Sequence, residues 1–328
     1  MQDSDFSTWG YEVLTHYDLK RPALTFIRHN ENITFQVVDA GSGEKYLLRL
    51  HKPITENFAS AQQRPVELAS ELLWLEALHR DSALTVQQPV RNRAGEFVTM
   101  IYPESDVGMS CTLLHWIEGE PLKQNVAAEL VEDLGTVVAQ LHEHVTSWSI
   151  PVGFVRPTYT IEFFMWQARL LLPGIEAGIL TAREYAIIQA LVAAAGELLA
   201  ATDTGQDNWG LIHADLHRGN CLVYQNRIRP IDFSLCGFGH FLLDFGSSLP
   251  SFRGELRQSF ITGYLKRRKL PENYLRIIEA FCVLCRMCSY AFVLPRVSER
   301  ERLRARISHF VANECQQFLR NEPVLLAM

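Results

Sequence analysis

The second half of the chain holds a short run of polar side chains suited to catalysis. His213, Asp215 and His217 alternate along the chain, Asn220 follows them, and Asp232 comes twelve residues after Asn220. One carboxylate in such a set can accept a hydrogen bond from an attacking hydroxyl. A second carboxylate and an amide oxygen can hold Mg²⁺, a hard ion that takes oxygen ligands. Such groups would suit phosphoryl transfer, which requires mainly positioning and charge neutralisation. Asp215 fits the first role, that of the base, and Asp232 with Asn220 fits the second, that of the metal ligands.

A short strand–turn–strand pattern connects these residues. Residues 221–224 and 228–231 alternate like strands, and Gln225-Asn226-Arg227 between them is typical of a turn. Asn220 and Asp232 therefore flank a predicted hairpin and should lie at the same end of it.

The pattern of the remaining chain divides it into two parts. Strands are predicted at 23–27, 33–38, 46–50, around Val90, at 97–101 and at 111–116, with one amphipathic helix at 67–78. After a break at 118–121 the pattern becomes helical, over 127–144, 161–172, 182–201 and most of 256–320. We predict an α+β fold: a small lobe, residues 1–117, with an antiparallel sheet and one helix, and a mainly helical large lobe, residues 118–328.

These motifs together resemble a known superfamily. His213, Asp215, Leu216 and Asn220 match the protein-kinase catalytic loop H-R-D-L-x-x-x-N, with Ala214 in place of Arg. The chain is similar to the aminoglycoside phosphotransferase and choline kinase superfamily in three further features: His217, the later Ile231-Asp232-Phe233, and then Leu243-Asp244-Phe245-Gly246. Its members read H-G-D-x-H-x-x-N followed by I-D-[FW]. Residues 31–38 and 48–53 look most like the bacterial branch with homoserine-kinase-like and stress-response kinases.

The resemblance implies a bilobal, protein-kinase-like fold, ATP and Mg²⁺ as cofactors, and several further roles. Asp244 should brace the catalytic loop, with His213 and His217 as structural support. Glu71 should pair with the phosphate-binding cation, which is Arg49 here where the family usually has Lys. The strand that ends in Leu114, His115 and Trp116 should offer backbone groups to adenine.

Two departures from the family pattern leave a nucleotide-binding pseudokinase as an alternative. Arg49 keeps the charge of Lys but is not equivalent to it. The expected nucleotide loop, residues 28–32, has no glycine, and Gly41-Ser42-Gly43 is better interpreted as a hairpin turn. No G-x-x-x-x-G-K-[ST] motif occurs, which excludes a P-loop enzyme.

The acceptor is the least specified part of the prediction. We expect a small molecule with a hydroxyl group, such as an amino alcohol, a sugar or an aminoglycoside-like compound; the alternative is a protein serine or threonine. Residues 159–172 and 241–252 should shape its pocket, and Phe163, Phe164 and Trp166 with Glu162 could form a cationic cage or simply core. A zinc hydrolase using His213, Asp215 and His217 is a rival interpretation.

Composition sets the remaining limits. The chain has 328 residues, 48% hydrophobic and 21% charged, with net charge −6. It therefore lacks the strong basic field that nucleic acid or an anionic membrane would require. No signal peptide or membrane span is predicted, and seven cysteines favour free thiols in the cytoplasm. Cys282, Cys285 and Cys288 share one helical stripe, which we interpret as buried core. The oligomeric state cannot be predicted from the sequence.

Overall fold

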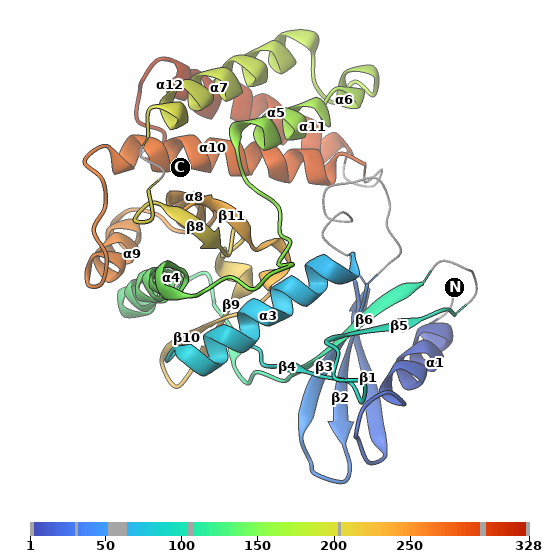
Figure 1. Ribbon diagram of the computed structural model, residues 1–328. Helices are drawn as coiled ribbons and strands as arrows, with labels where there is room; N and C mark the ends of the chain where they lie inside the picture. Colours follow the sequence, from blue (N-terminus) through green and yellow to red (C-terminus); the bar gives the residue numbers. More distant parts are fainter. Residues whose placement is uncertain are drawn as a thin grey trace.

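The computed structural model describes residues 3–29, 32–51, 64–103, 108–202, 205–295 and 300–325. Asn30 and Glu31 of the expected nucleotide loop lie outside these ranges. A twisted sheet with two helices occupies one part of the molecule and a group of helices the other (Figure 1). The predicted boundary at residues 117 and 118 falls between the last strand of this sheet, which ends at His115, and a short strand that begins at Glu120.

The first part is a six-stranded antiparallel sheet. Its central order is β1-β2-β3-β6-β4, and β5 pairs with β6. Residues alternate across it, so Phe35, Leu48 and Leu50 are buried on one face while Arg49 points to the other. The strands are β1 Pro22–His29, β2 Asn32–Asp39, β3 Lys45–His51, β4 Pro89–Val90, β5 Val98–Ile101 and β6 Met109–His115.

Two helices pack against the sheet, where the sequence indicated one. The predicted helix is α3, Pro65–Asp81. The helix that the sequence analysis missed is α1, Asp3–Leu14, whose Phe6, Trp9 and Val13 bury the Leu48 face (Figure 1). Because α1 covers that face, the opposite face with Arg49 is directed toward α3 and the rest of the molecule.

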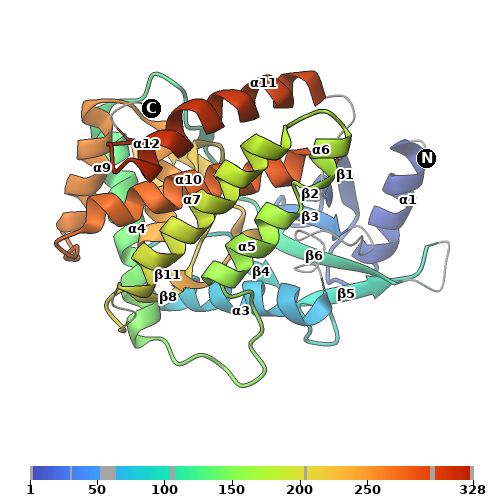
Figure 2. The same ribbon diagram turned by 90° about the horizontal axis from the view of Figure 1, so that it is seen from above.

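The second part is mainly helical, as predicted. Its long central helix α10, Tyr274–Val293, packs against α8 (Figure 1) and against α5 and α7 (Figure 2). Gly135 of α4 and Gly263 of α9 lie so close to the facing backbone that a Cβ at either position would collide with it. The helices are α4 Ala128–Ser147, α5 Ile161–Arg169, α6 Pro173–Glu176, α7 Ala182–Ala200, α8 Leu242–Ser248, α9 Glu255–Leu265, α10, α11 Arg300–Phe310 and α12 Gln316–Leu319.

Two small sheets lie among these helices and adjoin the segments that carry Asp215 and Asp232. The predicted hairpin is β9, Cys221–Tyr224, with β10, Arg227–Pro230, and its turn residues Gln225 and Asn226 have positive φ. β7, Glu120–Pro121, adds to β9. The second pair, β8, Trp209–Ile212, with β11, Gly237–His240, was not predicted from the sequence. Within the described ranges, no helix is long and apolar enough to span a bilayer.

Candidate active site

The backbone after β8 is held by the carboxylate of Asp244 on α8. Its Oδ1 accepts the Ala214 N–H at 2.7 Å and its Oδ2 accepts the His213 N–H at 3.2 Å. Asp244 is fully buried, and hydrogen bonds to a charged acceptor are stronger than neutral ones. Ala214 has φ of 65°, a left-handed conformation that costs energy for a residue with a Cβ. The carboxylate thus holds the chain in a conformation that aims Asp215 forward.

Asp244 is in turn oriented by a buried chain of side chains. His142 of α4 has its Nε2 at 2.9 Å from Asp244 Oδ2 and its Nδ1 at 3.0 Å from the Tyr264 hydroxyl. Burial lowers the pKa of His142, and the hydrogen bond to Asp244 only partly opposes this. The ring is therefore neutral near pH 7, with Nε2 donating to the carboxylate and Nδ1 accepting from Tyr264.

His213 connects the loop that carries Asp215 to the segment that carries Asp232. Its Nε2 donates to the Ile231 carbonyl at 3.1 Å, its Nδ1 accepts the Asp215 N–H at 3.3 Å, and its ring packs on Phe233. Both ring nitrogens are therefore used for structure and neither is left to bind zinc. Among the described residues, no three His, Cys, Asp or Glu side chains are placed to hold a metal ion together. The zinc-hydrolase interpretation has no support.

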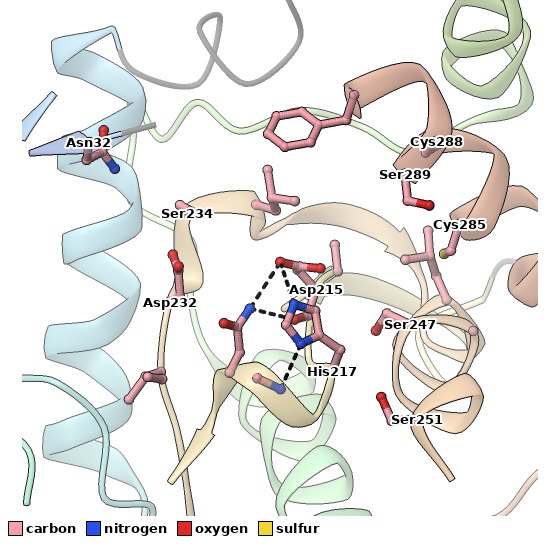
Figure 3. Close-up of a pocket in the computed structure, with 18 of the residues that line it drawn as sticks. Asn32, Asp215, His217, Asp232, Ser234, Ser247, Ser251, Cys285, Cys288 and Ser289 are labelled. Carbon is pink, nitrogen blue, oxygen red and sulfur yellow. Dashed lines mark hydrogen bonds and ion pairs between the residues drawn. The ribbon is translucent and has the colours of Figure 1, made fainter. Parts of the chain in front are cut away.

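Asn220 joins the proposed base to the hairpin. Its Nδ2 donates to the Asp215 backbone oxygen at 2.9 Å and to Asp215 Oδ2 at 3.0 Å. Because both contacts use the amide nitrogen, Oδ1 remains the atom through which Asn220 would bind a cation. His217 lies beside them, with Nε2 at 3.8 Å from Asp215 Oδ2 and Nδ1 accepting the Gly219 N–H at 2.8 Å (Figure 3).

Asp232 faces the same cavity from the end of β10 (Figure 3). Its backbone is left-handed, with φ of 64°, and the Ile231 N–H donates to the Asn220 carbonyl at 3.0 Å. Burial raises the pKa of Asp232, but the charge of Arg49, a hydrogen bond from Ser234 and other nearby positive groups together lower it. Asp232 is therefore a carboxylate at neutral pH, ready to bind a cation.

Arg49 is held by two acceptors. Its Nη1 lies 3.1 Å from Glu71 Oε1 on α3 and its Nη2 lies 3.2 Å from Gln87 Oε1. The pair expected between Glu71 and Arg49 is thus present, and the fork of the guanidinium explains how Gln87 is satisfied as well. Arg49 and Glu71 are 5% and 1% exposed, so both charges are shielded from water. Removing either side chain would leave the other charge buried without its partner in this pair.

Arg28 is a second cation at this end of the cavity, and the sequence analysis did not single it out. A β-bulge between Phe26 and Arg28 changes the register of β1, Arg28 lines the cavity, and its charge helps to lower the pKa of Asp232. The feature of the sequence that could have indicated Arg28 is its position as a basic residue at the start of the expected nucleotide loop, which has no glycine.

The three residues expected near adenine differ in position. Trp116 lines the cavity, whereas Leu114 and His115 are not part of its lining. The backbone N–H of His115 donates to the Gln88 carbonyl, and that of Trp116 donates to the Lys45 carbonyl. These two N–H groups are therefore already used within the protein. Ile117 and Gly119 line the cavity just beyond them. The segment after β6 therefore contributes more of this wall than the strand itself.

A single cavity of about 1360 Å³ extends from these groups to the helices. Phe163, Phe164 and Gln167 of α5 line it, while Glu162, Trp166 and Arg169 do not. The cysteine stripe of α10 also lines it: Cys282 is fully buried, but Cys285 and Cys288 are partly exposed and, with Ser289, face Asp215 across the cavity (Figure 3). The interpretation of the stripe as buried core therefore holds fully for Cys282 and in part for Cys285 and Cys288, which pack against the core but are also exposed to the cavity.

Comparison with known proteins identifies the family. The model of the phosphotransferase enzyme family APH matches residues 23–279. The chain belongs to this family. It is therefore a kinase that acts on hydroxyl groups, with the predicted protein-kinase-like α+β fold.

Individual relatives agree with this assignment. The structure of a microcompartment-associated aminopropanol kinase is similar over 97% of this chain and 99% of its own, with a TM-score of 0.79 and 29% identity. Amicoumacin kinase hAmiN, solved in complex with AMP-PNP, Ca²⁺ and Ami, has a TM-score of 0.76 over 98% of this chain and 95% of its own; at 19% identity it supports the fold alone. Amicoumacin kinase of Bacillus subtilis (strain 168) is 31% identical over 116 residues, 30% of this chain and only 34% of that relative.

Proposed function

We propose that this kinase transfers the γ-phosphoryl group of ATP to a hydroxyl of a small molecule, with Asp215 as the base and with Asp232 and Asn220 holding Mg²⁺. The observation that carries the proposal is the meeting of these three groups at one cavity. Asn220 contacts Asp215 through its side chain and is tied to the Asp232 segment through its carbonyl.

The donor set fits Mg²⁺. Asp232 offers a carboxylate and Asn220 an amide oxygen, and Mg²⁺ prefers few protein oxygens together with phosphate oxygens and water. When bound there, the ion would neutralise charge on the phosphates. Arg49 and Arg28 would add positive charge on the side of the sheet, and Trp116 with the segment after it would contact the base of the nucleotide.

Asp215 is suited to orient an acceptor hydroxyl. Asn220 and His217 flank its Oδ2, so the carboxylate is fixed in direction, while the side of the cavity toward α10 remains for the acceptor. A carboxylate that accepts the hydroxyl hydrogen bond contributes about 10²- to 10⁴-fold to a rate.

A small-molecule acceptor has more support than a protein. The cavity continues past Asp215 between α5, α8 and α10, which gives an acceptor its own binding volume. Amino alcohols, sugars and aminoglycoside-like compounds remain the classes to test, because a similar structure is an aminopropanol kinase.

The test is ATP-dependent ADP release with a panel of small alcohols and with generic protein substrates. We expect release with a small alcohol, a loss of about 10²- to 10⁴-fold in Asp215→Asn, and none in Asp18→Asn, whose side chain is 88% exposed. Full activity of Asp215→Asn would refute the assigned base. Turnover of protein substrates alone would indicate the stress-type protein kinase instead. If neither the small alcohols nor the protein substrates increased ADP release, the proposed transfer would be refuted.

A further inference from the structure

The part of the cavity on the α10 and α11 side of Asp215 is lined by positively charged side chains. Arg286 of α10 and Arg306 of α11 line it. Among the described lining residues the only carboxylates are Asp215 and Asp232, which belong to the reaction centre. In the described part of the lining, an acceptor that reaches this side of the cavity therefore meets two arginine side chains and no carboxylate beyond these two.

Arg286 is held in place by a carboxylate that lies outside the cavity lining. Its Nη1 pairs with Glu314 Oε1 at 3.1 Å, and the Glu314 side chain is only 8% exposed and does not line the cavity. Tyr290, one turn along α10, lies between Arg286 and Arg306, whose guanidinium stands 5.6 Å from its ring centroid. Among the described residues, the two guanidiniums have one carboxylate, Glu314, beside them, so this part of the cavity can attract one carboxylate of a ligand.

Gln167 of α5 adds an unused hydrogen-bond donor to the same cavity. It is 3% exposed, lines the cavity, and its Nε2 has no hydrogen-bond partner among the described residues. A buried N–H without a partner costs energy, so such groups usually serve a ligand or water. A carboxylate or carbonyl oxygen of a ligand could accept a hydrogen bond from this N–H.

We propose that the acceptor is a short hydroxylated carboxylate, whose hydroxyl lies at Asp215 and whose carboxylate is bound by Arg286 with help from Arg306 and Gln167. This deepens the proposed function and rests on it. It also argues against the cationic cage considered from the sequence, because Glu162, the acid that such a cage would need, lies outside the cavity lining.

The α10 thiols provide a test that needs no turnover. Cys285 precedes Arg286 and, like Cys288, lines the cavity. Alkylation by anionic iodoacetate and by neutral iodoacetamide uses the same thiolate, so the ratio of the two rates cancels the thiol pKa and reports the local charge. Mass spectrometry resolves the two sites. Relative to free glutathione, we expect the iodoacetate-to-iodoacetamide ratio to be raised by about fivefold or more.

Arg286→Gln should remove most of this increase, whereas Arg169→Gln, on an exposed part of α5 outside the cavity lining, should leave it unchanged. A ratio at or below that of glutathione in the wild-type protein would overturn the proposal, and so would an unchanged ratio in Arg286→Gln.

The substrate class is tested with matched acceptors that differ only at the far end: 4-hydroxybutanoate, butane-1,4-diol and 4-amino-1-butanol, with their three-carbon counterparts. Binding is measured by ligand-observed NMR and turnover by ADP release. We expect the carboxylates to bind best, and Arg286→Gln to weaken them by about 10- to 100-fold while sparing the diols. Tighter binding of the amines, or no binding of the carboxylates, would overturn this inference. The proposed function would stand separately, since it is decided by Asp215→Asn with any acceptor that is turned over.

Discussion

Replacing Arg49 by Lys tests how the cation that we propose for phosphate binding is held in place. Arg49 bridges Glu71 and Gln87 through separate guanidinium nitrogens. A Lys ammonium is a single point donor on a flexible stem, so Arg49→Lys can retain the ion pair with Glu71 but not the bond to Gln87 as well. The substitution would restore the residue usual in the family and still be unfavourable here.

The cost follows from burial. Arg49 and Gln87 are each 5% exposed, so Gln87 Oε1 would be left without a partner in a site where water has little access. An unsatisfied buried polar group costs about 1–3 kcal/mol. We expect Arg49→Lys to lower the free energy of unfolding by that amount. We expect KM for ATP to rise by about three- to tenfold, because the cation is no longer fixed by two contacts.

Urea unfolding and ADP-release kinetics measure both effects, and a double-mutant cycle with Gln87→Leu isolates the contact. In the Gln87→Leu background Arg49→Lys should cost less than in the wild type, with a coupling energy of about 1–2 kcal/mol. An Arg49→Lys protein that is as stable as the wild type, or that loses equal stability in both backgrounds, would refute the bridging role.

Three other predictions concern the supports of the site. Asp244→Asn should lower the free energy of unfolding by about 2–4 kcal/mol and speed hydrogen exchange at Ala214, because one backbone N–H would then face an amide donor; unchanged exchange would contradict the bracing role. Burial and the charge of Arg49 lower the pKa of His51 from 6.5 to about 3. The stability this provides is complete above pH 6.5 and is lost as pH falls, by about 1.4 kcal/mol per unit for the one proton. His51→Gln should therefore flatten the urea-unfolding profile below pH 6.5, and an unaltered slope would argue against a neutral buried ring. Gly135→Ala should cost about 1–3 kcal/mol, because its Cβ would meet the Phe260 carbonyl of α9. Gly196→Ala, facing only the flexible Ile161 side chain, is the control, and equal losses would disprove the close approach of α4 and α9.

Local patterns predicted the hairpin that lies between the proposed metal ligands, Asn220 and Asp232. The spacing of Asn220 and Asp232 around a hairpin is short-range information, and the structure has that hairpin at residues 221–230. The contact between Arg49 and Glu71 came from the family pattern and is present at 3.1 Å.

Elements that depend on distant packing were missed. Helix α1 has an interior glycine, Gly10, which lowers its helix propensity, and that glycine leaves room for Leu24 of β1. Strands β8 and β11 are four residues each and contain glycines, and they pair across a long sequence separation. No local periodicity specifies such a partner.

The acceptor end could be predicted only in part. A helical stripe of cysteines indicates one face of α10 but not whether that face meets protein or a cavity. All three cysteines line the cavity, but Cys282 is fully buried whereas Cys285 and Cys288 are partly exposed, and this difference is set by where α5 and α8 pack. Arg286 was missed for the same reason.

Binding of Mn²⁺ in the presence of AMP-PNP, followed by electron paramagnetic resonance, tests the central claim most directly. This measurement distinguishes the proposed metal ligand, Asp232, from the proposed base, Asp215, which are both carboxylates at the same cavity. Asp232→Asn should weaken nucleotide-dependent Mn²⁺ binding by about tenfold or more, while Asp215→Asn should bind the ion as the wild type does and yet fail to transfer phosphate. If Asp232→Asn bound Mn²⁺ as tightly as the wild type, the assignment of the metal site would be contradicted.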